Sequence, residues 1–249
     1  MFINNIHIFF YVGIGIVGLI IGRFLDLINT NLSKHKKIFS IQIIKDYMKH
    51  TNSNYILMTI TCVLYIALLR VIGFEDKLKL IQFLILTPML ISVFCIDYKL
   101  QIIPNRLTIT ILEVGIVFSF LRGINNLNIA VEMWIGMLLG ACIFLILTLV
   151  GNIIFRKETM GFGDVKLMGA LGLFFGWRNI IAISILSFFI AAIFSIIFII
   201  KKKIKKEDIQ EFIPFGPFIV LATFMLMFIP LDFLIKMTFV IFTFGRYSL

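Results

Sequence analysis

Charged residues are scarce in this chain: Asp, Glu, Lys and Arg together make up 14% of its 249 residues. Hydrophobic residues make up 61%, and the mean hydropathy is +1.08. A water-soluble protein has too little interior to bury that much apolar surface, so the composition indicates a polytopic membrane protein. Alternating apolar and polar residues in ten-residue blocks are also absent, which argues against a membrane β-barrel. We therefore expect an all-α fold.

Paired cysteines are absent as well. Cys62, Cys95 and Cys142 each stand alone in an apolar run, and no Cys-x-x-Cys sequence occurs. Neither a zinc knuckle nor a disulfide framework is supported. The three histidines are scattered without a partner at ligand spacing, so we expect no bound metal.

Eight apolar runs approach the ~20 residues that a helix needs to cross a bilayer. They cover residues 6–28, 55–73, 79–97, 106–121, 131–152, 165–177, 179–200 and 217–236. The first run has no basic leader segment and no small-residue cleavage site, so we expect a retained span rather than a signal peptide.

The net charge of +10 is concentrated in the short loops between these runs. Fifteen Lys and Arg residues lie in or beside the odd-numbered loops, against five on the opposite side. Because basic loops stay in the cytoplasm, the odd loops are predicted to be cytoplasmic and both termini to lie outside. The orientation of the loops explains why they are basic, so the charge does not require a nucleic-acid partner. We therefore expect contact with membrane lipid and none with nucleic acid.

Two carboxyl groups are predicted to share one depth in the membrane. Asp97 ends the third run in the sequence CIDYKLQIIPN, and Asp164 begins the sixth run in GFGDVKL. The topology puts both at the cytoplasmic boundary. Gly161 and Gly163 allow the backbone before Asp164 to approach another chain closely. An acid in the first turn of a helix is the simpler interpretation of this motif alone, but the second acid at matched depth favours a functional pair.

Other intramembrane acids leave an alternative open. Glu113 falls near the middle of the fourth run with no charge one helical turn away, so we expect it to be protonated, paired with another helix, or part of a polar cavity. Such acids also serve proton-coupled transporters and channels, which often have two repeats with matching broken helices. No repeat is visible here. A third interpretation is a non-catalytic membrane scaffold, in which the acids would be dispensable.

Four stretches of the sequence resemble the type IV prepilin peptidases, the prepilin leader peptidases that are related by mechanism to the GxGD-type intramembrane aspartyl proteases. Residues 97–105 are similar to the family's first catalytic aspartate and the IPN segment that follows it. GFGDVKL at 161–167 is similar to the family's GxGDxKL, and IPFGP at 213–217 to its PFGP. Residues 22–27 give a weaker match. Their order and spacing agree over nearly the whole chain.

The resemblance implies a bacterial cell-membrane aspartic endopeptidase that removes the basic leader from type IV prepilins or pseudopilins. Asp97 and Asp164 would be its catalytic pair. Two carboxyl groups that share one proton provide a base to activate water and an acid to polarise the scissile carbonyl. The matching positions expected to place the substrate or the backbone are Gly161, Gly163, Lys166, Pro104, Pro214, Gly216 and Pro217. For Lys166, snorkelling toward the cytosol is the simpler interpretation.

One departure from the family concerns the first cytoplasmic loop. Many members carry two Cys-x-x-Cys pairs there, bind zinc and methylate the new N-terminus of the pilin, whereas residues 29–54 contain no cysteine. The N-methyltransferase activity is therefore doubtful, and we expect no cofactor. We divide the chain into residues 1–54, a first span with a short basic loop, and residues 55–249, an aspartyl peptidase membrane domain. The oligomeric state is left open by the sequence.

Overall fold

The structure is a computed structural model, and it describes residues 2–3, 6–33, 55–156, 159–205, 214–234 and 236. In these ranges the regular secondary structure is helical apart from one antiparallel pair of two-residue strands, β1 (Phe2–Ile3) and β2 (Ile6–His7). The predicted all-α architecture is confirmed. Most of the predicted basic loop at 29–54 lies outside the described residues.

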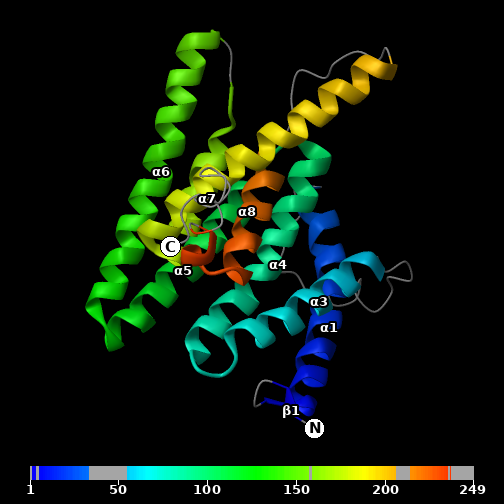
Figure 1. The fold of residues 1–249 in the computed structure, drawn as a ribbon, viewed down its shortest axis with the longest axis vertical. Helices are drawn as coiled ribbons and strands as arrows, with labels where there is room; N and C mark the ends of the chain where they lie inside the picture. Colours follow the sequence, from blue (N-terminus) through cyan, green and yellow to red (C-terminus); the bar gives the residue numbers. More distant parts are fainter. Residues whose placement is uncertain are drawn as a thin grey trace.

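Helices account for nearly all of the described chain (Figure 1). They are α1 (Ile8–Ser33), α3 (Tyr55–Ile72), α4 (Lys77–Leu100), α5 (Asn105–Asn125), α6 (Leu127–Phe155), α7 (Phe162–Lys205) and α8 (Gly216–Phe228). In this part of the chain, six helices are long and apolar enough to cross a membrane, whereas α8 is a shorter apolar helix. The chain is a polytopic membrane protein, as its composition predicts.

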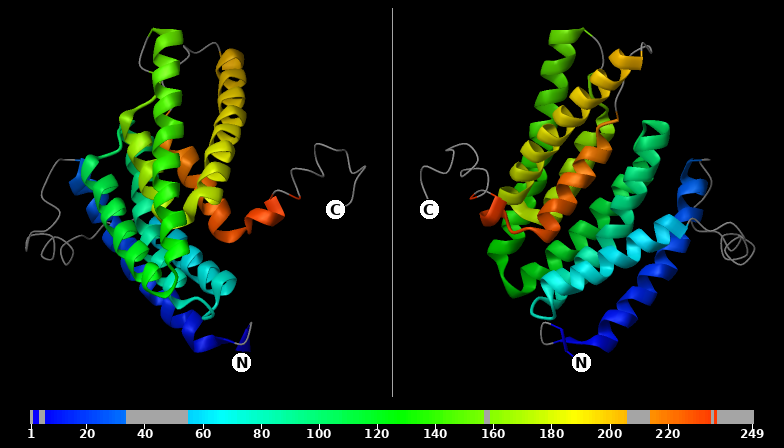
Figure 2. Two further views of the ribbon diagram at one scale, coloured as in Figure 1. Left: turned by 90° about the vertical axis from the view of Figure 1, so that its left-hand side faces the viewer. Right: turned by 45° about the vertical axis from the view of Figure 1, so that its right-hand side comes forward.

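The sixth and seventh predicted spans, 165–177 and 179–200, correspond to the two helical halves of α7, which join at a kink without a loop between them. A straight helix of its 44 residues would be about 66 Å long, roughly twice the thickness of the hydrocarbon core. Gly176, with φ 73° and ψ 176°, interrupts the helical backbone, and the chain turns back there (Figure 2). Only glycine adopts such a conformation without strain. One residue therefore takes the place of a loop.

The last predicted span, 217–236, is shorter in the structure. α8 ends at Phe228, and Ile229 has an extended backbone immediately before Pro230. A proline disfavours a helical conformation at the residue before it and supplies no N–H to continue the helix. The proline thus ends α8 within the apolar run.

The backbones of α6 and α7 pack almost in contact. A Cβ atom on Gly136 would lie 2.6 Å from the carbonyl oxygen of Gly172, and one on Gly140 would lie 2.5 Å from that of Met168. In lipid, burying apolar surface does not drive helices together, so they associate through close van der Waals contact. Small residues such as glycine allow that contact. The absence of side chains at Gly136 and Gly140 therefore permits the close approach of the two helices.

A second close contact joins α1 to α3. The Thr61 hydroxyl group donates a hydrogen bond of 2.8 Å to the carbonyl oxygen of Gly18. A Cβ atom on Gly18 would lie 2.9 Å from the Cα atom of Cys62. The absence of a side chain at Gly18 therefore permits both the approach of the two helices and their hydrogen bond.

Four helix ends gather on one side of the bundle (Figure 1). α4 ends there, and α5, α7 and α8 begin there, with residues 101–104 as the short link between α4 and α5. On the opposite side, Arg122 and Asp76 form an ion pair of 2.9 Å. The motif residues lie at the four gathered ends, so the fold brings them to one level.

Gly172→Ala should destabilise the α6–α7 contact, because the new Cβ atom would overlap the backbone of Gly136 and Met137. Overpacking of this kind costs about 1–3 kcal/mol. Thermal unfolding of the detergent-purified protein should show a lower midpoint. Gly13→Ala is the control, since nothing lies within 4 Å of its added Cβ atom. Equal midpoints for the two variants would contradict the close approach.

Candidate active site

Asp97 lies in the last turn of α4 and is buried, with 4% of its surface exposed. Its Oδ2 atom accepts a hydrogen bond of 2.9 Å from the backbone N–H of Gly216, the first residue of α8. The first N–H groups of a helix have no partner within the helix and attract negative charge. The start of α8 is therefore a hydrogen-bond donor for this carboxyl group.

Glycine is required at position 216 by the closeness of this contact. A Cβ atom there would lie 2.5 Å from Oδ2 of Asp97 and 3.1 Å from its Cγ atom. Pro217 is buried in the first turn of α8, where the missing N–H of proline costs nothing, and Pro214 is half-buried just before the helix. The PFGP stretch, residues 214–217, thus begins a helix directly against Asp97.

Asp164 lies in the first turn of α7 and is also buried, with 7% of its surface exposed. Its own N–H donates to the carbonyl oxygen of Gly161 at 3.1 Å, and the N–H of Gly161 donates to its carboxyl group. Among the described residues, the buried Oδ1 atom has no hydrogen-bond partner. One oxygen of this carboxyl group is therefore held by the turn, and the other is free of it.

The two predicted aspartates lie at the same end of the bundle, close enough to influence each other. The carboxyl group of Asp164 interacts electrostatically with that of Asp97. Each lies at a helix N-terminus, Asp97 against α8 and Asp164 within α7. Across the described ranges, no three His, Cys, Asp or Glu side chains gather as metal ligands. The site consists of two buried carboxyl groups and the backbone N–H groups that face them.

Three further motif residues lie beside the pair. Gly163 packs on Ile103, because a Cβ atom at Gly163 would lie 3.0 Å from the Cβ atom of Ile103. Pro104 is the N-cap of α5. Lys166 is exposed, and its ammonium group donates a hydrogen bond of 2.8 Å to Oδ1 of Asn105. Lys166 therefore bonds to a neighbouring helix rather than only extending toward solvent.

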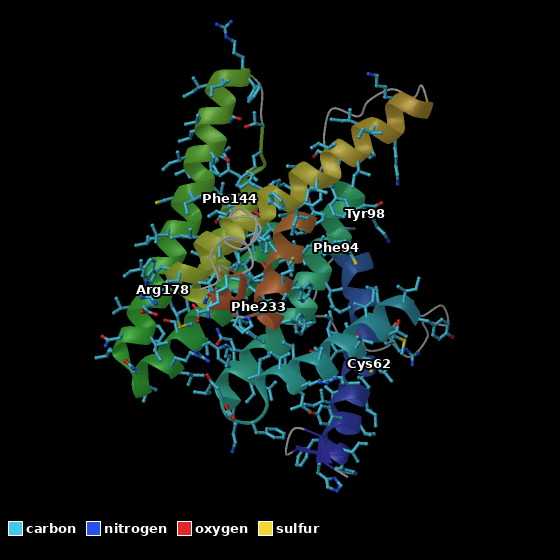
Figure 3. All side chains as sticks on the ribbon, viewed as in Figure 1. Cys62, Phe94, Tyr98, Phe144, Arg178 and Phe233 are labelled. Atoms are coloured by element: carbon cyan, nitrogen blue, oxygen red, sulfur yellow. The ribbon has the colours of Figure 1, made fainter. Side chains whose placement is uncertain are left out.

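Tyr98, the residue after Asp97, points outward from the same end of α4 (Figure 3). Its side chain is 69% exposed, and its ring stacks on Phe94 with the centroids 6.3 Å apart. The last turn of α4 thus turns its acid inward and its aromatic rings outward. The buried pair lies on the protein side of this turn.

Glu113 lies apart from this arrangement. Its side chain is exposed on α5. The part in a polar cavity expected for Glu113 stays a prediction. Conversely, sequence analysis gave no role to Asn105, although its position directly after a proline at the start of a helix marked it as a residue near the motif.

Comparisons with known proteins identify the family. The sequence profile of the type IV leader peptidase family matches residues 84–196, a segment that contains both aspartates. Leader peptidase HopD of Escherichia coli is 30% identical over 145 residues, which cover 58% of this chain and 90% of that relative. The chain belongs to the type IV leader peptidase family. Its members are aspartic peptidases, so the resemblance drawn from the motifs is confirmed.

Other relatives are longer proteins. The prepilin leader peptidase/N-methyltransferase of Aeromonas salmonicida is 34% identical over 139 residues, which cover 56% of this chain and 46% of that protein. The protein of the same name from Legionella pneumophila is 31% identical over 158 residues, covering 62% and 52%. The chain spans about half the length of these two relatives. No solved structure matches it.

The hydrogen bond between α8 and Asp97 can be measured as stability. Asp97→Asn keeps an oxygen that accepts from the Gly216 N–H, whereas Asp97→Leu leaves this buried N–H without an acceptor. An unpaired buried donor costs about 1–3 kcal/mol, so the leucine variant should unfold at a lower temperature than the asparagine variant. If the two melted together in detergent, the hydrogen bond would not contribute.

Proposed function

We propose that this protein is a membrane aspartic endopeptidase that removes the basic leader of type IV prepilin-like substrates at the cytoplasmic edge of the bacterial cell membrane. The observation that carries the proposal is the pair of buried, interacting carboxyl groups, Asp97 and Asp164, at one end of the bundle. Family membership supports the same reaction, since HopD, most of whose length is matched, is named a leader peptidase.

Hydrolysis of a peptide bond by this pair requires that the two carboxyl groups share a single proton. Like charges held close in a buried site cannot both ionise cheaply, so one group is a carboxylate and the other a carboxylic acid. The carboxylate takes a proton from water, whose oxygen attacks the carbonyl carbon of the scissile peptide bond. The acid gives its proton to the carbonyl oxygen. When the C–N bond breaks, the proton taken from water passes to the leaving amine. One hydroxyl group of the diol intermediate gives its proton back to the other aspartate, so the pair again holds one proton.

Oδ1 of Asp164 is suited to contact the substrate in this reaction. It is buried and, among the described residues, has no hydrogen-bond partner. A buried polar atom without a partner is costly. A water molecule that donates to this oxygen, or a substrate carbonyl that accepts from its protonated form, therefore gains binding energy there. Oδ2 of Asp97 is already bonded to Gly216 and keeps its carboxyl group in place.

The location of the pair also fits the substrate class. Hydrolysis consumes water, which the bilayer core lacks, and the pair lies where four helices end rather than in their middles. A prepilin-like substrate, with a basic leader before an apolar helix, would present its junction at the same depth. The proposal covers peptide cleavage alone, because the zinc-binding cysteines of methylating relatives are missing from residues 29–54.

The proposed orientation extends the positive-inside argument to the helices. The halves of α7 on either side of Gly176 would cross separately, and α8 would be the eighth crossing, which leaves both termini outside. Reporter fusions test this arrangement in cells. Alkaline phosphatase, active only outside the cytoplasm, should be active when fused at either terminus and inactive when inserted at residues 206–213. Activity at the inserted position would reverse the orientation.

Asp97→Asn and Asp164→Asn should each reduce cleavage of a purified prepilin to the uncatalysed level, because an amide supplies neither the base nor the acid. Loss of a member of such a unit typically costs 10⁴-fold or more. Cleavage is measured by mass spectrometry of the shortened product in detergent or liposomes.

The matched control is Asp76→Asn, which also removes one carboxylate but at the opposite end of the bundle, where Asp76 is bonded to Arg122. This variant should cleave like wild type. Near-normal cleavage by either site variant would refute the catalytic pair. No cleavage of any prepilin by the wild-type protein would favour a transporter or a scaffold.

A further inference from the structure

The link between α4 and α5 touches both halves of the site. Gln101 ends α4 in the left-handed conformation, with φ 55°, and its N–H donates 2.8 Å to the carbonyl oxygen of Asp97. Residues 101–105 therefore leave α4 directly from the turn that carries Asp97. A non-glycine residue with positive φ is uncommon, and here it directs the link toward α7.

The first contact with α7 is an apolar one. Ile103, which is 8% exposed, belongs to the buried core and packs on Gly163, the residue before Asp164. A Cβ atom at Gly163 would lie 3.0 Å from the Cβ atom and 3.6 Å from the carbonyl oxygen of Ile103. The link thus rests on the backbone of the turn that carries the second aspartate.

The second contact with α7 is polar. Lys166 donates 2.8 Å to Oδ1 of Asn105, so the side chain two residues after Asp164 is bonded to the first residue of α5. Pro104 fixes the backbone between Ile103 and Asn105 near φ −62°. Together, the two contacts hold residues 101–105 to α7 on both sides of Asp164.

We propose that residues 101–105 are a clamp that sets the separation of the two aspartates, and that Asn105 is a positioning residue that closes it through Lys166. This inference rests on the proposed peptidase function. In this role Lys166 holds α5 to α7 and does not bind the substrate. The role accounts for the hydrogen bond between its charged side chain and a neighbouring helix. Neither Asn105 nor Lys166 contacts the reacting atoms.

The alternative is that Lys166 binds the substrate directly. The two roles give different kinetics. If Lys166 binds the substrate, its replacement raises KM, and the effect is independent of Asn105. If the two residues close a clamp, replacing either one misplaces the carboxyl groups, which lowers kcat and leaves KM largely unchanged.

The test is a double-mutant cycle on prepilin cleavage. Asn105→Ala and Lys166→Met should each lower kcat about tenfold with KM unchanged, and the double variant should be no slower than either single variant, because both remove the same hydrogen bond. Asn105→Asp, which keeps an acceptor for the ammonium group, should restore most of the activity. Thr110→Val is the control on α5, since its exposed hydroxyl group donates to the Arg106 carbonyl oxygen within that helix. Additive losses, or a rise in KM for Lys166→Met alone, would overturn the clamp.

A second measurement does not depend on cleavage. Spin labels replace Tyr98 and Phe162, which are 69% and 60% exposed and lie next to the two aspartate-bearing turns. In a chain whose native cysteines are replaced by alanine, Asn105→Ala and Lys166→Met should each broaden the distance distribution, and Thr110→Val should not. If the wild-type protein cleaves nothing, the proposed function fails while the label distances still test the clamp. An unchanged distribution in Asn105→Ala refutes the clamp whether or not the protein cleaves prepilin.

Discussion

A buried carboxyl group is stable only where hydrogen-bond donors replace the water it has lost, and this constraint governs the end of the bundle where Asp97 lies. The donor comes from the start of α8, whose first N–H groups have no partners in their own helix. α8 must therefore begin at one place, and its first residue must be a glycine because of the short distance to the carboxyl group. A short apolar helix without a charged residue thereby becomes part of the candidate site.

The carboxyl group of Asp164 receives its hydrogen bond from a donor close by in the sequence. The turn that begins α7 supplies the N–H of Gly161 to Asp164, and the repulsion between the two acids opposes their approach. Packing elsewhere in the fold must hold them together against this repulsion. Gly172 packs on the backbone of Gly136, and Gly163 packs on the Cβ atom of Ile103. Contacts this close leave the helices little room to move apart. Rigid placement of groups that repel each other is typical of catalytic sites.

The bend at Gly176 has a functional consequence at the other end of the same helix. Because the chain reverses there, the two halves of α7 extend toward the side where α4 ends and α8 begins (Figure 2). Without the reversal, the segment that follows α7 would emerge on the opposite side, and α8 could not begin against Asp97. One glycine in a conformation closed to other residues thus connects the topology of the membrane domain to the hydrogen bond at the site.

Sequence by itself determined the membrane class, the helical architecture and the two aspartates, because apolar runs, loop charges and the Gly-x-Gly-Asp motif are all local patterns. It left the surroundings of Glu113 open, since a midspan acid faces the interior or the surface depending on helix rotation, which a single run does not encode. The two spans it predicted at 165–177 and 179–200 correspond to the helical halves of α7 on either side of Gly176. It made α8 longer than it is, because hydropathy does not record a helix end inside an apolar run. The hydrogen bond from Gly216 to Asp97 and the contact of Asn105 with Lys166 join residues 119 and 61 positions apart, and only the tertiary structure decided them. Such contacts depend on how whole helices pack, and no property of either residue's neighbours in the sequence fixes that packing.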